Sequence, residues 1–321
     1  MAKGPRKLRV SFDTPSLTHY GGVYLLHRFL TRIGLKHALA MELRMVQRNN
    51  RYSVGEMLLA LLYPMFLGLE RIETTSLLCE NGVFQYLTGL PSYPNPTTLR
   101  RFLLRVAPTA LTKLRALHDR FLGRMILLPS PPARITFDVD SSGLVVYGKQ
   151  EQARLGYNPI EHGRPSYHPL LCFEGQSRDF WHGELRPGDV YTATGAVDLL
   201  KASFAKVPPR VRSIIIRADK GFYDRALVEW LEAKRAGFVI VARLTGPLQR
   251  RLSHLRYTSP SPGIEVAEFR YQPTRWQRAH RFVVIRRPQP EEPTEQLTLF
   301  KLGRYHYQVV VTNLSLQPLN L

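Results

Sequence analysis

The chain has 321 residues, of which 44% are hydrophobic and 22% are charged. This is the composition of a globular protein, and its length suits about two packed domains of roughly 100–200 residues each. Lysine and arginine outnumber aspartate and glutamate by 45 to 25, a formal charge of +20. Because neutralising phosphates releases counterions, this charge favours DNA or RNA as a partner; a solvated basic surface without a specific partner is the alternative.

The sequence argues against secretion and against a membrane span. Its basic start, MAKGPRKLRVSFD, is followed by no apolar run that could serve in a signal peptide, so we expect a cytoplasmic protein. The most apolar segment, from Met57 to Leu69, contains Pro64 and Gly68 and is shorter than the roughly 18 residues of a span, which predicts a buried helix. Cys79 and Cys172 are too few for a disulfide framework or a thiolate zinc site.

The first part of the chain, from about His19 to Leu127, has apolar residues at helical spacing. Ser53 and Glu56 have the spacing of a capping box at a helix start. A second helix is expected to begin at Asn95-Pro96, because asparagine is a good N-cap and proline is tolerated in the first turn.

That second helix carries Arg100, Arg101 and Arg105. It is a candidate DNA-reading helix of the helix-turn-helix kind, whose early residues would face phosphates and base edges. An amphipathic helix with a solvated basic face is the alternative.

A proline-rich stretch from Leu127 to Arg134 separates this helical part from a mixed pattern. The segments that follow predict three strands, a helix, a strand, a helix and a strand. They are ARITFDVDSSGLVVYG, HPLLCFEG, RDFWHGELRPG, TATGAVDLLKASFAKV, VRSIIIRAD, DRALVEWLEAKRAG and FVIVARL. The order matches the front of an RNase H-like α/β fold, in which an antiparallel region continues into a parallel, helix-covered sheet.

After about Gly246 the pattern becomes one of alternating strands: EVAEFRYQP, HRFVVIRR, QLTLFKL and YHYQVVVTNL. We interpret it as a β-rich insertion or appendage that follows the last core strand. The expected organisation is therefore an all-helical, DNA-binding domain over residues 1–130, an RNase H-like core over 131–245 and the β-rich part over 246–321.

Two acidic clusters occur at expected strand ends. Asp138 and Asp140 alternate along one strand and should share a face. Two carboxylates on one face repel each other unless a cation or a basic group lies between them, and a magnesium site is one solution. Asp219 follows the apolar strand SIIIR and precedes a glycine turn, at the carboxyl edge where open α/β sheets bind ligands.

The combination DVDSSGLVVYGKQEQARLGYNP, GRPSYHPLL and RADKGFY resembles the catalytic core of bacterial insertion-sequence transposases with an RNase H-like DDE domain. The resemblance covers roughly Arg134 to Leu314. In that family two aspartates and a glutamate hold two divalent ions, usually Mg²⁺, with Mn²⁺ as a substitute. The resemblance gives Asp140 the role of the first aspartate and Asp219 that of the second, with Asp138 in reserve for the first. Local capping of a turn by Asp140 and of a helix by Asp219 is the alternative.

The chain departs from the family at the third acid, which lies on a helix beyond the β-rich part. Nothing after Asn313 supplies it, so we expect a C-terminally truncated product with uncertain activity. Glu229 and Glu232 are expected to face solvent in charge pairs. Glu291, Glu292 and Glu295 lie in a polar linker that shows no sign of a rigid site.

Further residues are candidate DNA contacts. Lys149, Arg164 and His168 lie among aromatic residues of the resembling segment and could contact a DNA end, although surface packing is equally consistent with the pattern. Arg275 and Trp276 could bind DNA or wedge into a distorted duplex end; a tryptophan that clamps the β-sheet is the alternative. The histidines have no zinc-ligand spacing.

The leading interpretation is a transposase that binds the terminal inverted repeats of its element and target DNA as a synaptic homo-oligomer at the bacterial nucleoid. A non-catalytic, truncated DNA-binding remnant is the second hypothesis. A host nuclease of the same fold is the third.

Overall fold

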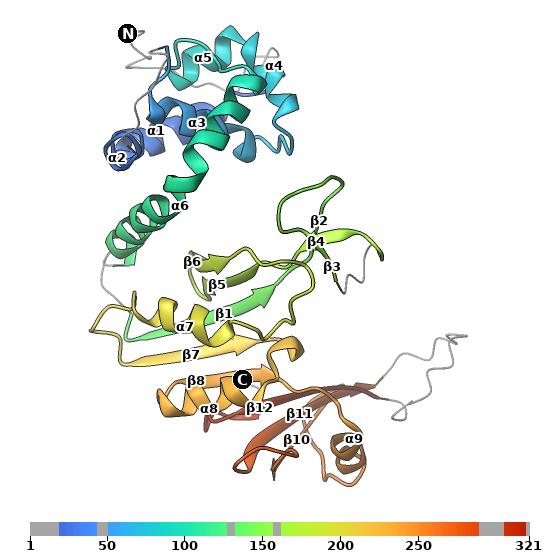
Figure 1. Cartoon of the computed structure of the whole chain (residues 1–321). Helices are drawn as coiled ribbons and strands as arrows, with labels where there is room; N and C mark the ends of the chain where they lie inside the picture. Colours follow the sequence, from blue (N-terminus) through green and yellow to red (C-terminus); the bar gives the residue numbers. More distant parts are fainter. Residues whose placement is uncertain (1–18, 44–50, 127–131, 157–161, 289–304, 319–321) are drawn as a thin grey trace. The chain divides into compact units, whose positions relative to one another are not determined.

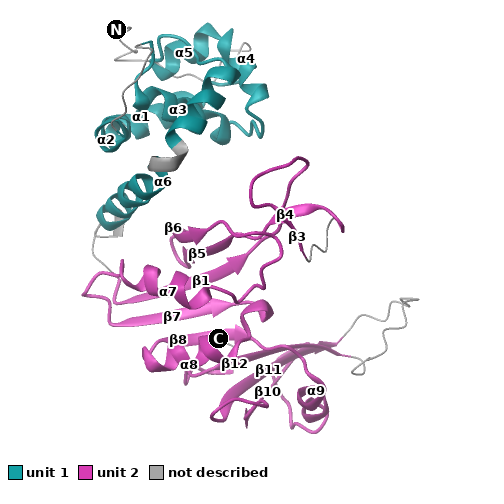
Figure 2. Ribbon diagram, viewed as in Figure 1, with its two compact units in different colours: residues 1–125 teal, residues 126–321 magenta. Residues whose placement is uncertain are grey.

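The computed structural model describes residues 19–43, 51–126, 132–156, 162–288 and 305–318. The chain divides into two compact units, residues 1–125 and 126–321 (Figure 2). Most of the proline-rich stretch at the expected boundary, residues 127–131, lies outside the described residues. Among the helices that the structure describes, none has the length and apolar character needed to cross a membrane.

The first unit is helical, as its spacing predicts (Figure 1). Its buried centre joins aromatic rings edge to face: Phe84 lies 5.8 Å from Tyr63 and 5.7 Å from Tyr93 between ring centroids. The elements are α1 (Val23–Arg32), α2 (Leu35–Glu42), α3 (Val54–Phe66), η1 (Glu73–Thr75), α4 (Ser76–Cys79), α5 (Gly82–Thr88) and α6 (Pro96–Ile126).

Both expected helix starts are confirmed. The Ser53 hydroxyl accepts a hydrogen bond from the Glu56 amide at 3.2 Å, while the Glu56 carboxylate accepts one from the Ser53 amide at 2.8 Å. The Asn95 side chain accepts a bond from the Thr97 amide at 3.2 Å, ahead of α6. The apolar segment forms the largely buried α3, although the helix stops at Phe66, which is 61% exposed.

The second unit is built on a nine-stranded sheet in the order β6-β5-β1-β7-β8-β12-β11-β10-β9. Strands β1, β7 and β8 are parallel to one another, β5 pairs antiparallel with β1, and β6 pairs antiparallel with β5. With α7 and α8 following β6 and β7, this arrangement confirms the expected RNase H-like α/β fold. The core elements are β1 (Arg134–Ser141), β5 (Leu170–Glu174), β6 (Phe180–Glu184), α7 (Ala196–Phe204), β7 (Ser213–Ala218), η2 (Lys220–Phe222), α8 (Arg225–Ala233) and β8 (Gly237–Val241).

The β-rich part is joined to this core sheet instead of forming a separate appendage. Strand β12 pairs antiparallel with β8, with Val310 opposite Val241, so the later strands continue the same sheet. They are β9 (Thr258–Ser261), β10 (Ile264–Tyr271), β11 (His280–Pro288) and β12 (Tyr305–Thr312), preceded by α9 (Gly246–Leu252). The expected strand QLTLFKL lies outside the described residues.

A small second sheet, in the order β2-β4-β3, was not expected from the sequence. Its strands have two or three residues, too few for an alternating pattern to stand out. They are β2 (Leu144–Val145), β3 (Arg154–Leu155) and β4 (Pro165–Tyr167).

The two faces of β1 differ. Ile135, Phe137 and Val139 are buried, and the Phe137 ring meets Trp181 at 4.9 Å between centroids. Asp138 and Asp140 alternate with them and are more exposed, so the prediction that these two carboxylates share a face is confirmed. One side of the strand therefore holds the core, and the other carries the acidic groups.

Candidate metal-binding active site

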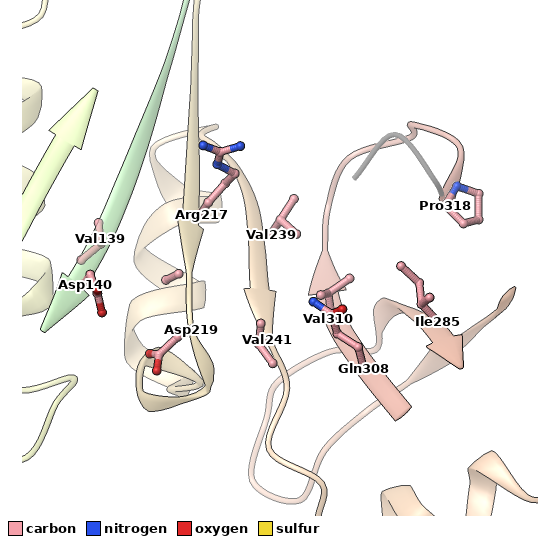
Figure 3. A pocket seen from close by; sticks show the side chains of 11 residues that line it. Val139, Asp140, Arg217, Asp219, Val239, Val241, Ile285, Gln308, Val310 and Pro318 are labelled. Carbon is pink, nitrogen blue, oxygen red and sulfur yellow. The ribbon is translucent and has the colours of Figure 1, made fainter. Parts of the chain in front are cut away.

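The parallel pairing of β1 and β7 brings the two predicted catalytic aspartates to one edge. The last register pair is Val139 opposite Ala218, so Asp140 and Asp219 each follow at the next position. Neighbouring strands lie about 4.8 Å apart. Figure 3 shows both carboxylates at the ends of adjacent strands, where they line one cavity of about 390 Å³.

Each carboxylate is held by a backbone amide. Asp140 Oδ1 accepts a hydrogen bond from the Ser141 amide at 2.7 Å, and Asp219 Oδ1 accepts one from the Gly221 amide at 2.9 Å. The capping role proposed for Asp219 is thus present at η2. It does not exclude metal binding, because one oxygen of each exposed carboxylate stays open to a ligand.

Asp138 has a different environment. Its carboxylate receives two hydrogen bonds from Arg217, at 2.6 and 2.7 Å, in a bidentate pair across β1 and β7. The same hydrogen bonding raises the pKa of Arg217. Since a basic group already neutralises Asp138, the geometry favours Asp140 over Asp138 as the ligand on β1.

The donor set fits a hard divalent cation. Exposed carboxylate oxygens are the ligands that Mg²⁺ prefers, and within the described ranges neither Asp140 nor Asp219 has an ion pair that would compete. Over the same part of the chain no group of three or more histidine, cysteine, aspartate or glutamate side chains could hold a metal. Two carboxylates are therefore the protein ligands that this part of the chain brings together.

The glutamates on α8 are held by basic partners. Glu229 lies 3.7 Å from Arg225, and Glu232 lies 3.1 Å from His280 and 3.5 Å from Arg278. The expected charge pairing is found, but the expectation that Glu232 faces solvent is wrong. Its side chain is 16% exposed, because β11 packs His280 against it. Glu291, Glu292 and Glu295 lie outside the described residues.

His168, predicted to contact DNA, belongs to a hydrogen-bond chain that leads to Asp140. Its Nδ1 lies 3.0 Å from the Val190 carbonyl, and its Nε2 lies 3.0 Å from the Ser141 hydroxyl. Because a carbonyl only accepts, Nδ1 must carry the proton and Nε2 accepts from Ser141 in the neutral ring. Ser141 in turn donates its amide to Asp140.

The other expected DNA contacts stay predictions. Arg100, Arg101 and Arg105 are exposed on α6, with Arg100 paired to Glu73. Lys149 and Arg164 are exposed near the small sheet. The Arg164 guanidinium also stacks over an aromatic ring, that of Tyr147, 4.8 Å from its centroid.

The wedge interpretation of Trp276 is not supported. Its residue is 9% exposed, and its ring packs 5.2 Å from that of Tyr223 and 5.0 Å from that of His280. A buried tryptophan cannot insert between base pairs without unpacking, so the structure favours the alternative, a clamp within the β-sheet. The neighbouring Arg275 is exposed and has a positive φ of 71°.

Three residues at the same edge were not singled out from the sequence: Tyr191, Lys220 and Arg243. They line a second cavity, of about 800 Å³, that also includes Asp219. Lys220 follows Asp219 directly and could have been noticed. Tyr191 and Arg243 come from loops whose approach depends on the sheet order.

Two adjacent aspartates at the end of an RNase H-like sheet are the kind of ligands that metal-dependent phosphoryl-transfer sites use. Residues 2–321 match the family model described as "Transposase DDE domain group 1", and the chain belongs to this family. The resemblance to DDE transposases is thereby confirmed at the level of the family. An origin in a bacterial insertion sequence stays a prediction.

Solved structures with some likeness are also transposases. A piggyBac transposase synaptic complex with hairpin DNA is 12% identical with a TM-score of 0.44, and the match covers 92% of this chain and 61% of that one. A Mos1 mariner paired-end complex with Mn is 13% identical with a TM-score of 0.23, covering 71% and 69% of the two chains. This chain thus spans less than two thirds of the piggyBac chain. The comparison with curated proteins gives no match.

Proposed function

We propose that this chain is a DNA transposase that binds the terminal inverted repeats of its element, cleaves the DNA there and joins the freed strands to target DNA. The observation that carries the proposal is the register of β1 and β7, which sets Asp140 and Asp219 side by side at the carboxyl edge of the sheet. Membership of the DDE family supplies the reaction class.

Asp140 and Asp219 are the residues that would hold Mg²⁺ or Mn²⁺. The bound ions would supply an activated water or 3′-hydroxyl as nucleophile and would stabilise the leaving oxygen. The amides of Ser141 and Gly221 fix the two carboxylates, and His168 fixes Ser141. Arg217 keeps Asp138 neutralised beside them.

DNA is the partner that the charge of +20 favours. The exposed arginines of α6, Arg100, Arg101 and Arg105, are the proposed contacts with the inverted repeat. Because both ends of an element must be joined together, we expect two or more copies of the chain in a synaptic complex.

The first test is metal-dependent nicking of a duplex that carries the element's terminal repeat. We expect activity with Mg²⁺ or Mn²⁺, and a loss of more than ~100-fold in Asp140→Asn and in Asp219→Asn, since even residues behind the ligands cost 10–100-fold. Asp198→Asn, at a side chain that is 75% exposed on α7, is the matched control and should keep full activity. Equal nicking activity in the unmodified chain and in all three variants would overturn the assignment of the site.

A non-catalytic DNA-binding protein is the second candidate. It is favoured by the absence, among the described residues, of a third carboxylate beside Asp140 and Asp219, because two ligands hold a pair of ions poorly. Binding to the terminal repeat with no nicking in either metal would select this candidate over the enzyme.

A further inference from the structure

A second cavity, of about 800 Å³, opens beside the candidate metal site, and Asp219 lines both. Its walls come from the end of β1, from β4, from the loop between β6 and α7, from η2 and from the segment after β8. The volume lies within the ~300–1,000 Å³ usual for ligand sites. The cavity is therefore large enough for a ligand that also reaches Asp219.

Close backbone packing builds these walls. A Cβ on Gly188 would lie 2.2 Å from the Ser166 hydroxyl, and a Cβ on Gly221 would lie 2.7 Å from Thr192 Cγ2. Any side chain at either position would push the loop after β6 away from β4 or from η2. The two glycines thus allow three separate segments of the chain to approach closely around the cavity.

The polar groups of the cavity suit a phosphate next to an aromatic ligand. Lys220 is exposed, and within the described ranges its ammonium group has no hydrogen-bond or ion-pair partner. Arg243 donates one hydrogen bond to the Tyr191 hydroxyl at 2.5 Å, which leaves other guanidinium N–H groups free to donate. Tyr191 is 51% exposed, and the Arg243 guanidinium lies over its ring, 5.9 Å from the centroid, so one face of the ring is left for stacking.

Two carboxylates, Asp189 and Asp219, face the same cavity. They make it a poor site for a free polyanion. A ligand in which phosphates alternate with neutral aromatic rings suits this mixture better, and a strand of nucleic acid is such a ligand.

We propose that this cavity holds one unpaired nucleotide of the DNA strand next to the scissile phosphate. Lys220 and Arg243 contact its phosphates, and the Tyr191 ring stacks on its base. The nucleotide is unpaired because both faces of a base in a duplex are covered by its neighbours, whereas Tyr191 needs a free face. This inference rests on the proposed function. Membership of the DDE family indicates DNA as the substrate, and Asp219 indicates where the cleaved phosphodiester bond lies.

The test measures binding without cleavage. The full chain, in buffer without divalent metal, is titrated into fluorescein-labelled hexathymidylate, and the dissociation constant is followed by anisotropy at several salt concentrations. We expect Tyr191→Ala to weaken binding by ~5- to 150-fold, the effect of one lost base stack. Lys220→Ala and Arg243→Ala should each reduce the salt slope by ~0.7, which corresponds to one phosphate contact.

Matched controls lie at the opposite edge of the sheet. Arg212 precedes β7 and Lys234 follows α8, and both are exposed. Arg212→Ala and Lys234→Ala remove the same charges and should leave the affinity within about twofold of the unmodified chain, as distant surface changes do. Pocket variants that bind as tightly as these controls would overturn the proposal.

Photocrosslinking locates the base. A hexathymidylate with one 5-iododeoxyuridine should form an adduct at Tyr191 that mapping by mass spectrometry finds and that Tyr191→Ala abolishes; an adduct confined to other residues would contradict the stack. Neither binding measurement needs catalysis. A failure of the nicking assay would therefore leave the nucleotide site untouched. If nicking depends on Asp140 but the pocket variants bind the oligonucleotide normally, the nucleotide site is wrong and the proposed function is not.

Discussion

At the scale of single residues, the site depends on which carboxylates have partners. Alternation along β1 is visible in the sequence and predicts that Asp138 and Asp140 share a face. Their different roles could not be read in the same way, because the partner of Asp138 is Arg217, 79 residues further along the chain. Only the register of β1 against β7 sets that arginine opposite Asp138 and leaves Asp140 open.

His168 illustrates the same limit. Its place among basic and aromatic residues predicts a DNA contact, whereas its bonds to Ser141 and Val190 lead us to propose that it positions Asp140. We expect His168→Ala to raise the Mn²⁺ concentration for half-maximal nicking by ~10–100-fold, as removal of supporting residues does. The KM for DNA should change little.

The measurement is a metal titration of nicking at saturating DNA, with partial recovery expected in His168→Asn. His162→Ala is the control, because His162 is exposed on the preceding turn. If His168→Ala instead raised the KM for DNA at an unchanged metal requirement, the original prediction of a DNA contact would be restored.

At the scale of elements, local signals identify helix starts well. The capping box of α3 is formed as its spacing predicts. We expect Ser53→Ala to lower the free energy of unfolding of the helical unit by ~0.5–2 kcal/mol, because the Glu56 amide loses the hydroxyl that accepts its hydrogen bond.

Urea unfolding followed by circular dichroism at 222 nm checks this value. Thr245, the N-cap of α9, makes no side-chain capping bond. Thr245→Ala should therefore change stability by less than ~0.5 kcal/mol. Similar losses in both variants would mean that the Ser53 bonds contribute nothing measurable.

The contact between α1 and α3 predicts a pH dependence. His27 bonds to the Tyr63 hydroxyl at 2.9 Å, and burial, with a smaller effect of Lys36, lowers its pKa below the ordinary 6.5. As the pH falls through 6.5, the unfolded chain binds a proton before the folded chain does. Stability is therefore full above this value and is lost as the pH drops toward the folded pKa.

We expect His27→Gln to reduce the loss of stability of the helical unit between pH 7.5 and 5.5. Hydrogen exchange of α1 and α3 amides, corrected for intrinsic rates, measures this loss of stability. The three tryptophans all lie in the second unit, so their fluorescence is an internal control that the substitution should leave unchanged. An unaltered pH dependence of exchange in His27→Gln would show that another group is responsible.

The strands of the core could be identified from their apolar runs, but their order in the sheet could not. Nothing in the pattern of β12 indicates that it pairs with β8, because alternation specifies a face and not a neighbour. The strands β2, β3 and β4 were not predicted, because two or three residues are too few to show an alternating pattern. The second cavity, which β4 lines together with the loop after β6 and the segments after β7 and β8, could consequently not be predicted from the sequence.

At the scale of the whole molecule, the charge of +20 sets how binding to DNA responds to salt. Each phosphate neutralised in a duplex contributes ~0.9 to the slope of log affinity against log salt. Arg101 and Arg105 are exposed one turn apart on α6. If both contact phosphates of the terminal repeat, the double variant Arg101→Ala, Arg105→Ala should reduce that slope by ~2.

Fluorescence anisotropy with a duplex of the repeat, measured from low to physiological salt, gives the slope. Lys113→Ala is the control, because Lys113 is exposed further along the same helix. A random duplex shows whether the arginines read sequence: equal losses on both duplexes mean phosphate contacts, whereas a larger loss on the repeat means contacts with base edges as well. An unchanged slope in the double variant would remove α6 from the DNA interface and leave its basic face solvated.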